Sequence, residues 1–285
     1  MSQRNVANTI EAMEVTEGAG VTVHRTIGTP ALRNLDPFLM LDHFSSDNPD
    51  DYIAGFPNHP HRGFITFTYM LDGHLEHQDS MGNTGDLRAG AAQWMKAASG
   101  VIHSEMPQQV AGLMRGFQLW INLPASEKMS EPEYQEYPSD AIPVHAADGV
   151  TVKVLIGQYG DALGPIKDPI TAVEYFDVTL NAGASFAHKL DGSKRAFVYL
   201  FEGEVETAGT DLSAHSLSVL GDGEEVLITA ENQRARFILV AGQPIGEPFA
   251  QYGPFVMNTE QEIHQAMADY RDGTLVQKKA ALISG

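Results

Sequence analysis

The sequence predicts an all-β protein, organised as two similar β-barrels in tandem with one short helix near the C-terminus. Short runs rich in Val, Ile, Phe, Tyr and Thr recur along most of the chain. Glycine-bearing turn signals separate these runs, and a weak internal echo links the two halves. Closely spaced short strands with such turns are typical of a sandwich or a barrel.

The predicted strands are apolar or alternating segments of five to eight residues. They are Phe64–Leu71, Gly116–Leu123, Val150–Ile156, Val173–Leu180, Ala196–Phe201 and Arg236–Val240. The predicted helix is Thr259–Tyr270, where Thr259 would cap the first turn and Glu262 would complete a capping box.

The internal echo predicts where one barrel ends and the next begins. Leu71-Asp72-Gly73 closes an apolar strand in the first half, and Phe201-Glu202-Gly203 does the same in the second. The Pro- and Glu-rich stretch Ser126–Pro143 lies between them. We therefore expect an N-terminal barrel over residues 1–135, and a C-terminal barrel with the helix over residues 136–285.

Composition excludes several classes of protein. The 285 residues contain no cysteine, which rules out disulfides, a cysteine nucleophile and thiolate metal sites. The net charge of −19 is shared almost equally by the two halves, which disfavours binding to nucleic acid through phosphates. No apolar stretch is long enough to span a membrane, and the first residues lack the apolar region of a secretion signal. We expect a soluble cytoplasmic protein.

Two short motifs carry candidate metal ligands. His59-Pro60-His61 places two imidazoles on one face of an extended chain, because side chains alternate along a strand. His103-Ser104-Glu105 repeats this spacing with an imidazole and a carboxylate. Single histidines are more often hydrogen-bonded structural residues, but two such pairs favour a site for a first-row divalent metal.

Strand parity predicts the surroundings of this site. If the strand continues from His61 without a bulge, His59 and His61 share a face with the apolar side chains at 65, 67, 69 and 71. Phe67 and Tyr69 would then be walls that hold a planar ligand. Gln118 shares a face with Trp120 and could reach the same pocket.

Two further histidines, His74 and His77, follow a predicted strand end. We expect a solvated polar hairpin here, and a place for His77 beside the metal ligands is the alternative.

The metal motifs and their neighbours closely resemble the pirin family of the cupin superfamily. The resemblance covers nearly the whole chain in order, at Asn34–Leu39, His59–Phe64, Gln93–Met95, Gly100–Pro107, Leu119–Leu123, Ser126–Met129 and Gly253–Asn258. It implies a bicupin, in which residues matching His59, His61, His103 and Glu105 hold one metal ion in the N-terminal barrel. Iron is the metal that the family implies, with Mn, Ni, Cu and Zn as alternatives.

The second barrel departs from a metal-binding cupin pattern. Its matching stretch, Gly183–His188, has one histidine where such a cupin has two, and His215 has no carboxylate beside it. The resemblance thus implies a metal-free second barrel. In the first barrel, Ile65 replaces a glutamate that many pirins carry, which removes one candidate acid or base near the metal.

The resemblance implies a quercetin 2,3-dioxygenase-type enzyme, with a flavonol-like substrate and dioxygen as its partners. Glu105 would be both a metal ligand and the catalytic base for the substrate hydroxyl. The alternative is a non-catalytic, metal-dependent regulator that binds a partner protein, as described for animal pirins in transcription and for some bacterial pirins on metabolic enzymes. A third possibility is a cupin enzyme with other chemistry, such as an isomerase. We expect a monomer that makes no direct contact with nucleic acid or membrane.

Overall fold

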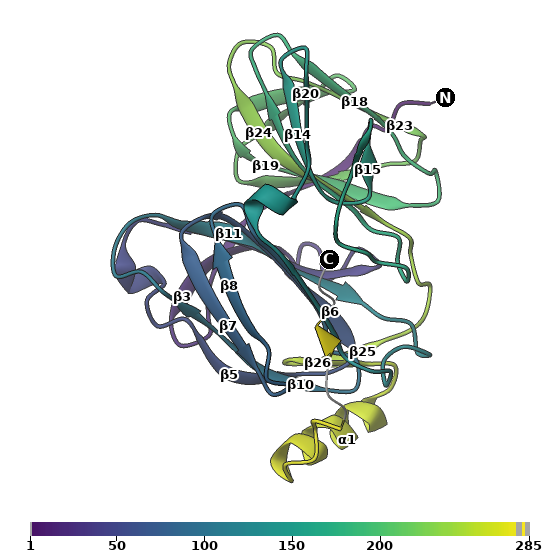
Figure 1. Ribbon diagram of the computed structural model, residues 1–285. Helices are drawn as coiled ribbons and strands as arrows, with labels where there is room; N and C mark the ends of the chain where they lie inside the picture. Colours follow the sequence, from purple (N-terminus) through teal and green to yellow (C-terminus); the bar gives the residue numbers. More distant parts are fainter. Residues whose placement is uncertain (1, 278–280, 283–285) are drawn as a thin grey trace. The chain divides into compact units, whose positions relative to one another are not determined.

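The computed structural model describes residues 2–277, 281 and 282 (Figure 1). Most of its regular elements are β-strands, as the sequence predicts. The chain divides into two compact units. We call the first unit the part made of residues 14–28, 38–139 and the described chain from Ile245 onward. The second unit contains the chain up to Met13, residues 29–37 and residues 140–244.

Two sheets form the first unit. The larger sheet has the strand order β2-β3-β4-β11-β6-β9-β12-β27, and the smaller has the order β5-β10-β7-β8. The strands of the larger sheet are β2 (Met13–Glu17), β3 (Val21–Ile27), β4 (Phe38–Ser46), β6 (Phe64–Asp72), β9 (Ala92–Lys96), β11 (Met114–Asn122), β12 (Glu133–Tyr137) and β27 (Ala281–Leu282). Those of the smaller sheet are β5 (Phe56–His61), β7 (His74–Asp79), β8 (Thr84–Arg88) and β10 (Val101–Pro107).

Side chains from both sheets build the core of the first unit. One apolar cluster joins Val21 and Phe44 of the larger sheet to Leu75 and Leu87 of the smaller sheet. β11 lies inside the larger sheet and pairs antiparallel with both β4 and β6. A short helix η1 (Pro49–Asp51) and the hairpin β25 (Ala250–Tyr252) and β26 (Phe255–Met257) complete this unit, together with the helix α1 (Glu260–Arg271).

The second unit repeats the two-sheet plan. Its larger sheet has the order β1-β22-β19-β24-β17-β14-β13, and its smaller sheet has the order β18-β23-β20-β21. These strands are β1 (Val6–Glu11), β13 (Val144–Ala147), β14 (Val150–Ile156), β17 (Glu174–Leu180), β18 (Ser185–Lys189), β19 (Arg195–Glu202), β20 (Glu204–Thr207), β21 (Thr210–Ser213), β22 (Ser216–Leu220), β23 (Glu225–Thr229) and β24 (Ala235–Gly242). The helix η2 (Ser139–Ala141) precedes β13, and β15 (Gln158–Tyr159) pairs with β16 (Ala162–Leu163). Apolar side chains such as Val152, Phe186 and Phe237 fill the space between the two sheets.

The ends of the chain do not follow a single cut at residue 135. The N-terminal strand β1 pairs antiparallel with β22 and so belongs to the second unit. The C-terminal helix α1 packs with β25 and β26 and so belongs to the first unit. Sequence patterns locate strands but carry little information on long-range pairing. β1 pairs with β22, and β27 pairs with β12, in both cases across a long stretch of sequence.

The structure confirms the predicted elements. The segments predicted as strands coincide with β6, β11, β14, β17, β19 and β24 to within two residues at each end. The helix α1 has the predicted capping box, in which the Thr259 hydroxyl accepts from the Glu262 backbone N–H and the Glu262 carboxylate accepts from the Thr259 N–H. Within the described residues, no helix is long and apolar enough to cross a membrane.

Candidate metal centre

Three histidines meet where β5 and β10 pair in the first unit. His59 and His61 lie on one face of β5, and His103 of β10 stands directly opposite His59 in the antiparallel register. Pro60 lies between the two ligands of β5 and has no backbone N–H to donate. Because β5 is an edge strand of its sheet, that missing donor costs little.

The three imidazoles offer nitrogen atoms that all lie within 4.8 Å of one another. Their ring centroids are 4.7 Å apart for His59 and His61, 4.3 Å for His59 and His103, and 4.8 Å for His61 and His103. His61 and His103 are buried, at 2% and 0% exposure. The set therefore has the close spacing that ligands of one metal ion require.

Several ring nitrogens of this histidine cluster have no hydrogen-bond partner. Nε2 of His103 and both ring nitrogens of His61 have none among the described residues. A buried polar atom without a partner costs about 1–3 kcal/mol, and a divalent cation would satisfy one nitrogen of each ring. Nδ1 of His59 lies 2.8 Å from the Pro57 carbonyl oxygen, so it carries the proton and leaves Nε2 free. The residues present thus fit a metal ion with nitrogen ligands.

Burial keeps two of the three histidines neutral, the form that binds a metal. It lowers the pKa of His61 well below its ordinary value, and the neighbouring His59 lowers it further, while the Pro254 backbone offsets a part. Burial also lowers the pKa of His103 well below the ordinary value, with His61 and His59 adding to the effect.

Glu105 lies on the same strand as His103 and lines a cavity together with His59 and His61. A register shift between the two residues places Glu105 opposite Phe56 of β5. Glu105 is 4% exposed, and its carboxylate accepts a hydrogen bond from the Gln118 side-chain amide at 3.3 Å. The Thr68 hydroxyl lies 3.0 Å from the same carboxylate and 2.5 Å from the Gln118 side-chain oxygen, so its single proton is shared between these two acceptors. The Glu105 oxygens are not in the group of mutually close ligand atoms that the three histidines form.

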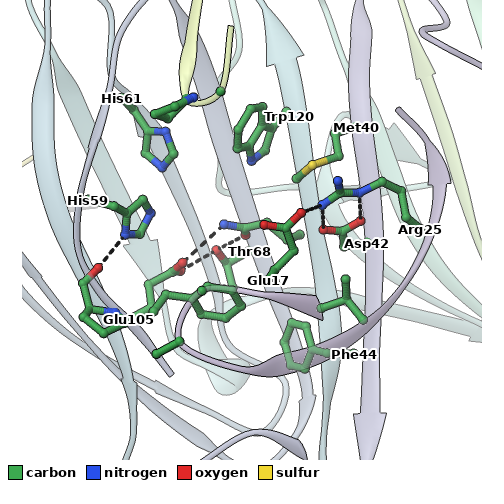
Figure 2. A pocket seen from close by; sticks show the side chains of 18 of the residues that line it. Glu17, Arg25, Met40, Asp42, Phe44, His59, His61, Thr68, Glu105 and Trp120 are labelled. Carbon is green, nitrogen blue, oxygen red and sulfur yellow. Dashed lines mark hydrogen bonds and ion pairs between the residues drawn. The ribbon is translucent and has the colours of Figure 1, made fainter. Parts of the chain in front are cut away.

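A cavity of about 610 Å³ adjoins the histidines (Figure 2). Figure 2 shows His59, His61 and Glu105 on one side and Arg25 with Asp42 on the other, with Trp120 and Met40 between them. Apolar and aromatic side chains, including Phe44 and Phe56, form much of the wall. This wall suits a flat, largely apolar ligand, with polar groups at both ends.

The side of the cavity opposite the histidines carries a network of charges. Arg25 makes a two-point contact with Asp42, with Nε to Oδ1 and Nη2 to Oδ2 both at 2.7 Å. Nη2 also lies 2.7 Å from Glu17 Oε1. Burial alone would lower the pKa of Arg25, but the two carboxylates raise it. This end combines a permanent cation with two acceptors and suits a hydroxyl, which both donates and accepts.

Buried cations hold the segment that follows His61. The Arg62 guanidinium donates to the Ser99 carbonyl at 2.7 Å and to the Asp269 carboxylate of α1 at 2.7 Å. The Lys128 ammonium donates to the carbonyl of Gly63 at 2.7 Å and to that of Val256 at 3.0 Å. The end of β5 is therefore fixed by the C-terminal part of the first unit.

Family comparisons agree with this geometry. The Pirin family model matches residues 20–121, and the model of the Pirin C-terminal cupin domain matches residues 175–276. A Pseudomonas aeruginosa protein, provisionally named a quercetin 2,3-dioxygenase, is 46% identical over 267 residues, which cover 91% of this chain and 93% of that protein. The chain belongs to the pirin family. Its two units are therefore cupin domains, and the protein is a bicupin.

Two more relatives support this assignment. Human pirin is 42% identical over 280 residues, which cover 95% of this chain and 93% of the human protein. The crystal structure of a quercetin 2,3-dioxygenase from Acinetobacter baumannii has a TM-score of 0.89 at 31% identity, and the match covers 96% of this chain and 99% of that one.

Some surroundings of the site differ from the sequence-based expectation. The cavity is lined by Thr68, and Phe67 and Tyr69 are not among its lining residues. The predicted parity is wrong because β5 ends at His61 and β6 begins at Phe64, in a different sheet. Gly63 makes this turn with a φ of 89°. The expectation that Gln118 and Trp120 reach the pocket is confirmed.

His77 also differs from the main expectation. It is 0% exposed and lies against His103, so the alternative place beside the metal ligands is confirmed for this residue. His74 is partly exposed and pairs with Asp86, as expected of a polar hairpin.

Sequence reasoning missed the opposite wall of the cavity. Arg25, Asp42 and Glu17 lie in strands whose alternation gives no sign of a ligand cavity. The charged Arg25, which follows His24 in a segment otherwise made of Val, Ile and Thr (Val21–Ile27), is the one signal that could have indicated them.

His188 of the second unit has ordinary ion-pair partners. Its Nε2 lies 2.6 Å from Glu174 Oε2, and Lys194 Nζ lies 2.7 Å from the other oxygen of the same carboxylate. His215 lies in a turn with a φ of 65°.

Proposed function

We propose that this pirin-family protein is a metal-dependent dioxygenase of flavonol-like substrates, of the quercetin 2,3-dioxygenase type. The observation that carries the proposal is the convergence of three imidazoles, with buried unpartnered nitrogens, of which His59 and His61 line an aromatic-walled cavity. The names of the Pseudomonas and Acinetobacter relatives point to the same reaction.

His59, His61 and His103 would hold the metal ion, and Glu105 would be the fourth ligand. Its place on the strand of His103 and in the cavity that His59 and His61 line supports that role. Nitrogen and oxygen ligands of this kind suit iron, which the family implies, as well as manganese, nickel, copper or zinc. A divalent ion bound here would act as a Lewis acid that lowers the pKa of the substrate hydroxyl.

The protein's own groups would bind the substrate and move its proton. Glu105 would accept the proton of the substrate hydroxyl, while Thr68 and Gln118 hold the carboxylate in place. Trp120 and Met40 would pack against the planar rings. Arg25 and Glu17 would bind a hydroxyl at the far end of the substrate.

Oxygen uptake with quercetin tests the proposal. We expect the purified, metal-loaded protein to consume dioxygen with quercetin, and the His103→Ala variant to lose both metal and uptake. His74→Ala is the matched control, because His74 is a partly exposed histidine outside the cavity. Stoichiometric metal without any uptake would overturn the dioxygenase and favour the non-catalytic regulator.

A further inference from the structure

The geometry points to a positioning role for His77 and Asp79: they orient the imidazole of His103 toward the metal through a chain of two hydrogen bonds. β10 pairs with β5 on one side and with β7 on the other. In the second pairing, His103 stands opposite Asp79 and Glu105 opposite His77. The inference concerns metal binding and does not depend on the proposed dioxygenase activity.

The first hydrogen bond joins two buried imidazoles. Nδ1 of His103 lies 3.3 Å from Nδ1 of His77, and both side chains are 0% exposed. The ring centroids are 5.1 Å apart. Nε2 of His103 has no partner among the described residues. One nitrogen of His103 thus faces the other metal ligands, and the opposite nitrogen faces His77.

The second hydrogen bond fixes the direction of the first. Nε2 of His77 lies 3.4 Å from Asp79 Oδ2. An ionised carboxylate only accepts, so His77 carries its proton on Nε2 and presents a lone pair at Nδ1. His103 must then carry its proton on Nδ1, which leaves the lone pair of Nε2 for a metal ion. This is the tautomer that a ligand at Nε2 requires.

Asp79 is anchored firmly enough to set this direction. Its Oδ1 accepts from the backbone N–H of Met81 at 2.8 Å and of Asn83 at 3.0 Å. Its Oδ2 also accepts from the Asn83 side-chain amide at 2.8 Å. Burial opposes ionisation, yet the hydrogen bonds from His77 and Asn83 lower the pKa of Asp79 below its ordinary value.

Packing holds the ring of His77 in the same orientation. The Tyr134 ring lies against it, with centroids 5.1 Å apart and an interplanar angle of 36°. The Tyr134 hydroxyl is itself bound to Glu136 and accepts from the Gln93 side chain at 2.7 Å. The imidazole of His77 therefore cannot turn freely away from His103.

The zinc affinity of two His77 variants tests this role. It is measured by competition between the metal-free protein and a chelator for Zn²⁺. His77→Phe keeps a flat ring and removes both hydrogen bonds, so we expect zinc to bind about 10–100-fold more weakly. His77→Gln has a side-chain oxygen that can accept from His103, so we expect it to recover most of the affinity. His74→Phe is the matched control on the same strand and should bind zinc as the wild type does.

Asp79→Asn provides a readout that a merely structural role would not change. The amide oxygen can keep accepting from the backbone N–H groups of Met81 and Asn83. The –NH₂ group then takes the place of Oδ2 and faces His77, and the Asn83 side-chain amide must flip to present its oxygen to it. His77 would then carry its proton on Nδ1 and push the proton of His103 onto Nε2, the metal-binding nitrogen. We expect long-range ¹H–¹⁵N spectra of the metal-free variant to show this other tautomer of His103.

Two results would overturn the inference. One is wild-type zinc affinity in His77→Phe. The other is an unchanged His103 tautomer in Asp79→Asn. Circular dichroism and thermal unfolding of the metal-free variants separate loss of positioning from loss of folding, and a variant that fails to fold leaves the other variant to decide.

Discussion

Glu105 depends on its neighbours for its position in the cavity. Its carboxylate lies within hydrogen-bond distance of Thr68 of β6 and Gln118 of β11, so the larger sheet orients a side chain that the smaller sheet carries. The metal-binding and proton-accepting roles proposed for Glu105 would need such support, because a shift of a fraction of an ångström would weaken both.

Thr68→Val tests this dependence. The substitution keeps the shape of the side chain but removes the hydroxyl that donates to Glu105. We expect quercetin turnover to fall about 10-fold, because loss of a residue that holds a metal-site carboxylate typically costs 10–100-fold. Steady-state oxygen uptake measures the effect, and metal content per chain serves as the internal control. Unchanged turnover would show that Thr68 does not orient Glu105.

The segment between β5 and β6 shows how whole elements position the metal ligands. Directly after His61 the chain turns at Arg62-Gly63. The buried Arg62 side chain donates to the Ser99 carbonyl, and the buried Lys128 side chain donates to the Gly63 carbonyl. Asp269 of α1 and Val256 of β26 supply partners for this turn. The C-terminal part of the first unit therefore stabilises the end of β5 that carries His59 and His61.

Gly63→Ala tests the turn itself. A Cβ at this position would lie 1.9 Å from the Val256 carbonyl oxygen, in a backbone with a φ of 89°. Gly82 has a similar φ of 86° and nothing within 4 Å of such a Cβ, so Gly82→Ala is the matched control. In urea unfolding we expect Gly82→Ala to cost about 1–2 kcal/mol, and Gly63→Ala to cost about 3 kcal/mol or more. Equal costs would contradict the close packing at Gly63.

Lys128 makes the same turn sensitive to pH. Burial lowers the pKa of this lysine to about 7, although nearby carboxylates oppose the shift. Between pH 7 and the ordinary lysine value, the unfolded chain binds one more proton than the folded chain does, so folding stability rises with pH. Lys128→Met removes this contribution.

We therefore expect the wild type to gain about 1–3 kcal/mol of unfolding free energy relative to Lys128→Met between pH 7 and 9. Urea titrations of both proteins at each pH measure the difference. A difference that stays constant or shrinks as the pH rises would contradict the lowered pKa.

Prediction from sequence succeeds where local pattern determines structure. The strand segments, the capping box at Thr259 and the shared strand of His59 and His61 follow from alternation, turn chemistry and the spacing of the motifs. The side of the cavity that holds Arg25 and the burial of His77 do not, because each depends on which distant strands pair. The parity argument failed at Gly63, where a single turn moves the chain from one sheet to the other.

At the scale of the whole molecule, the two cupin domains differ in their chemistry. In the first unit, three histidines lie together beside a cavity. In the second unit, apolar side chains fill the space between the two sheets. The net charge of −19 belongs to both halves of the sequence and so does not distinguish these roles. Metal binding should therefore stabilise the first unit directly.

Thermal unfolding tests that expectation. A ligand that binds only the folded state stabilises it by about 2.7 kcal/mol at a 100-fold excess over its Kd. We expect added Zn²⁺ to raise the Tm of the wild type, and a chelator to reverse the rise. The Tm of His103→Ala should not respond. A similar rise in that variant would place the bound metal elsewhere.

The central claim is that His59, His61 and His103 form a single metal centre. Equilibrium dialysis against a divalent first-row metal, followed by elemental analysis, tests it most directly. The structure predicts about one tightly bound ion per chain in the wild type and in His74→Ala, and loss of that ion in His103→Ala. A wild-type chain that binds no metal, or a His103→Ala chain that binds as much as the wild type, would contradict the claim.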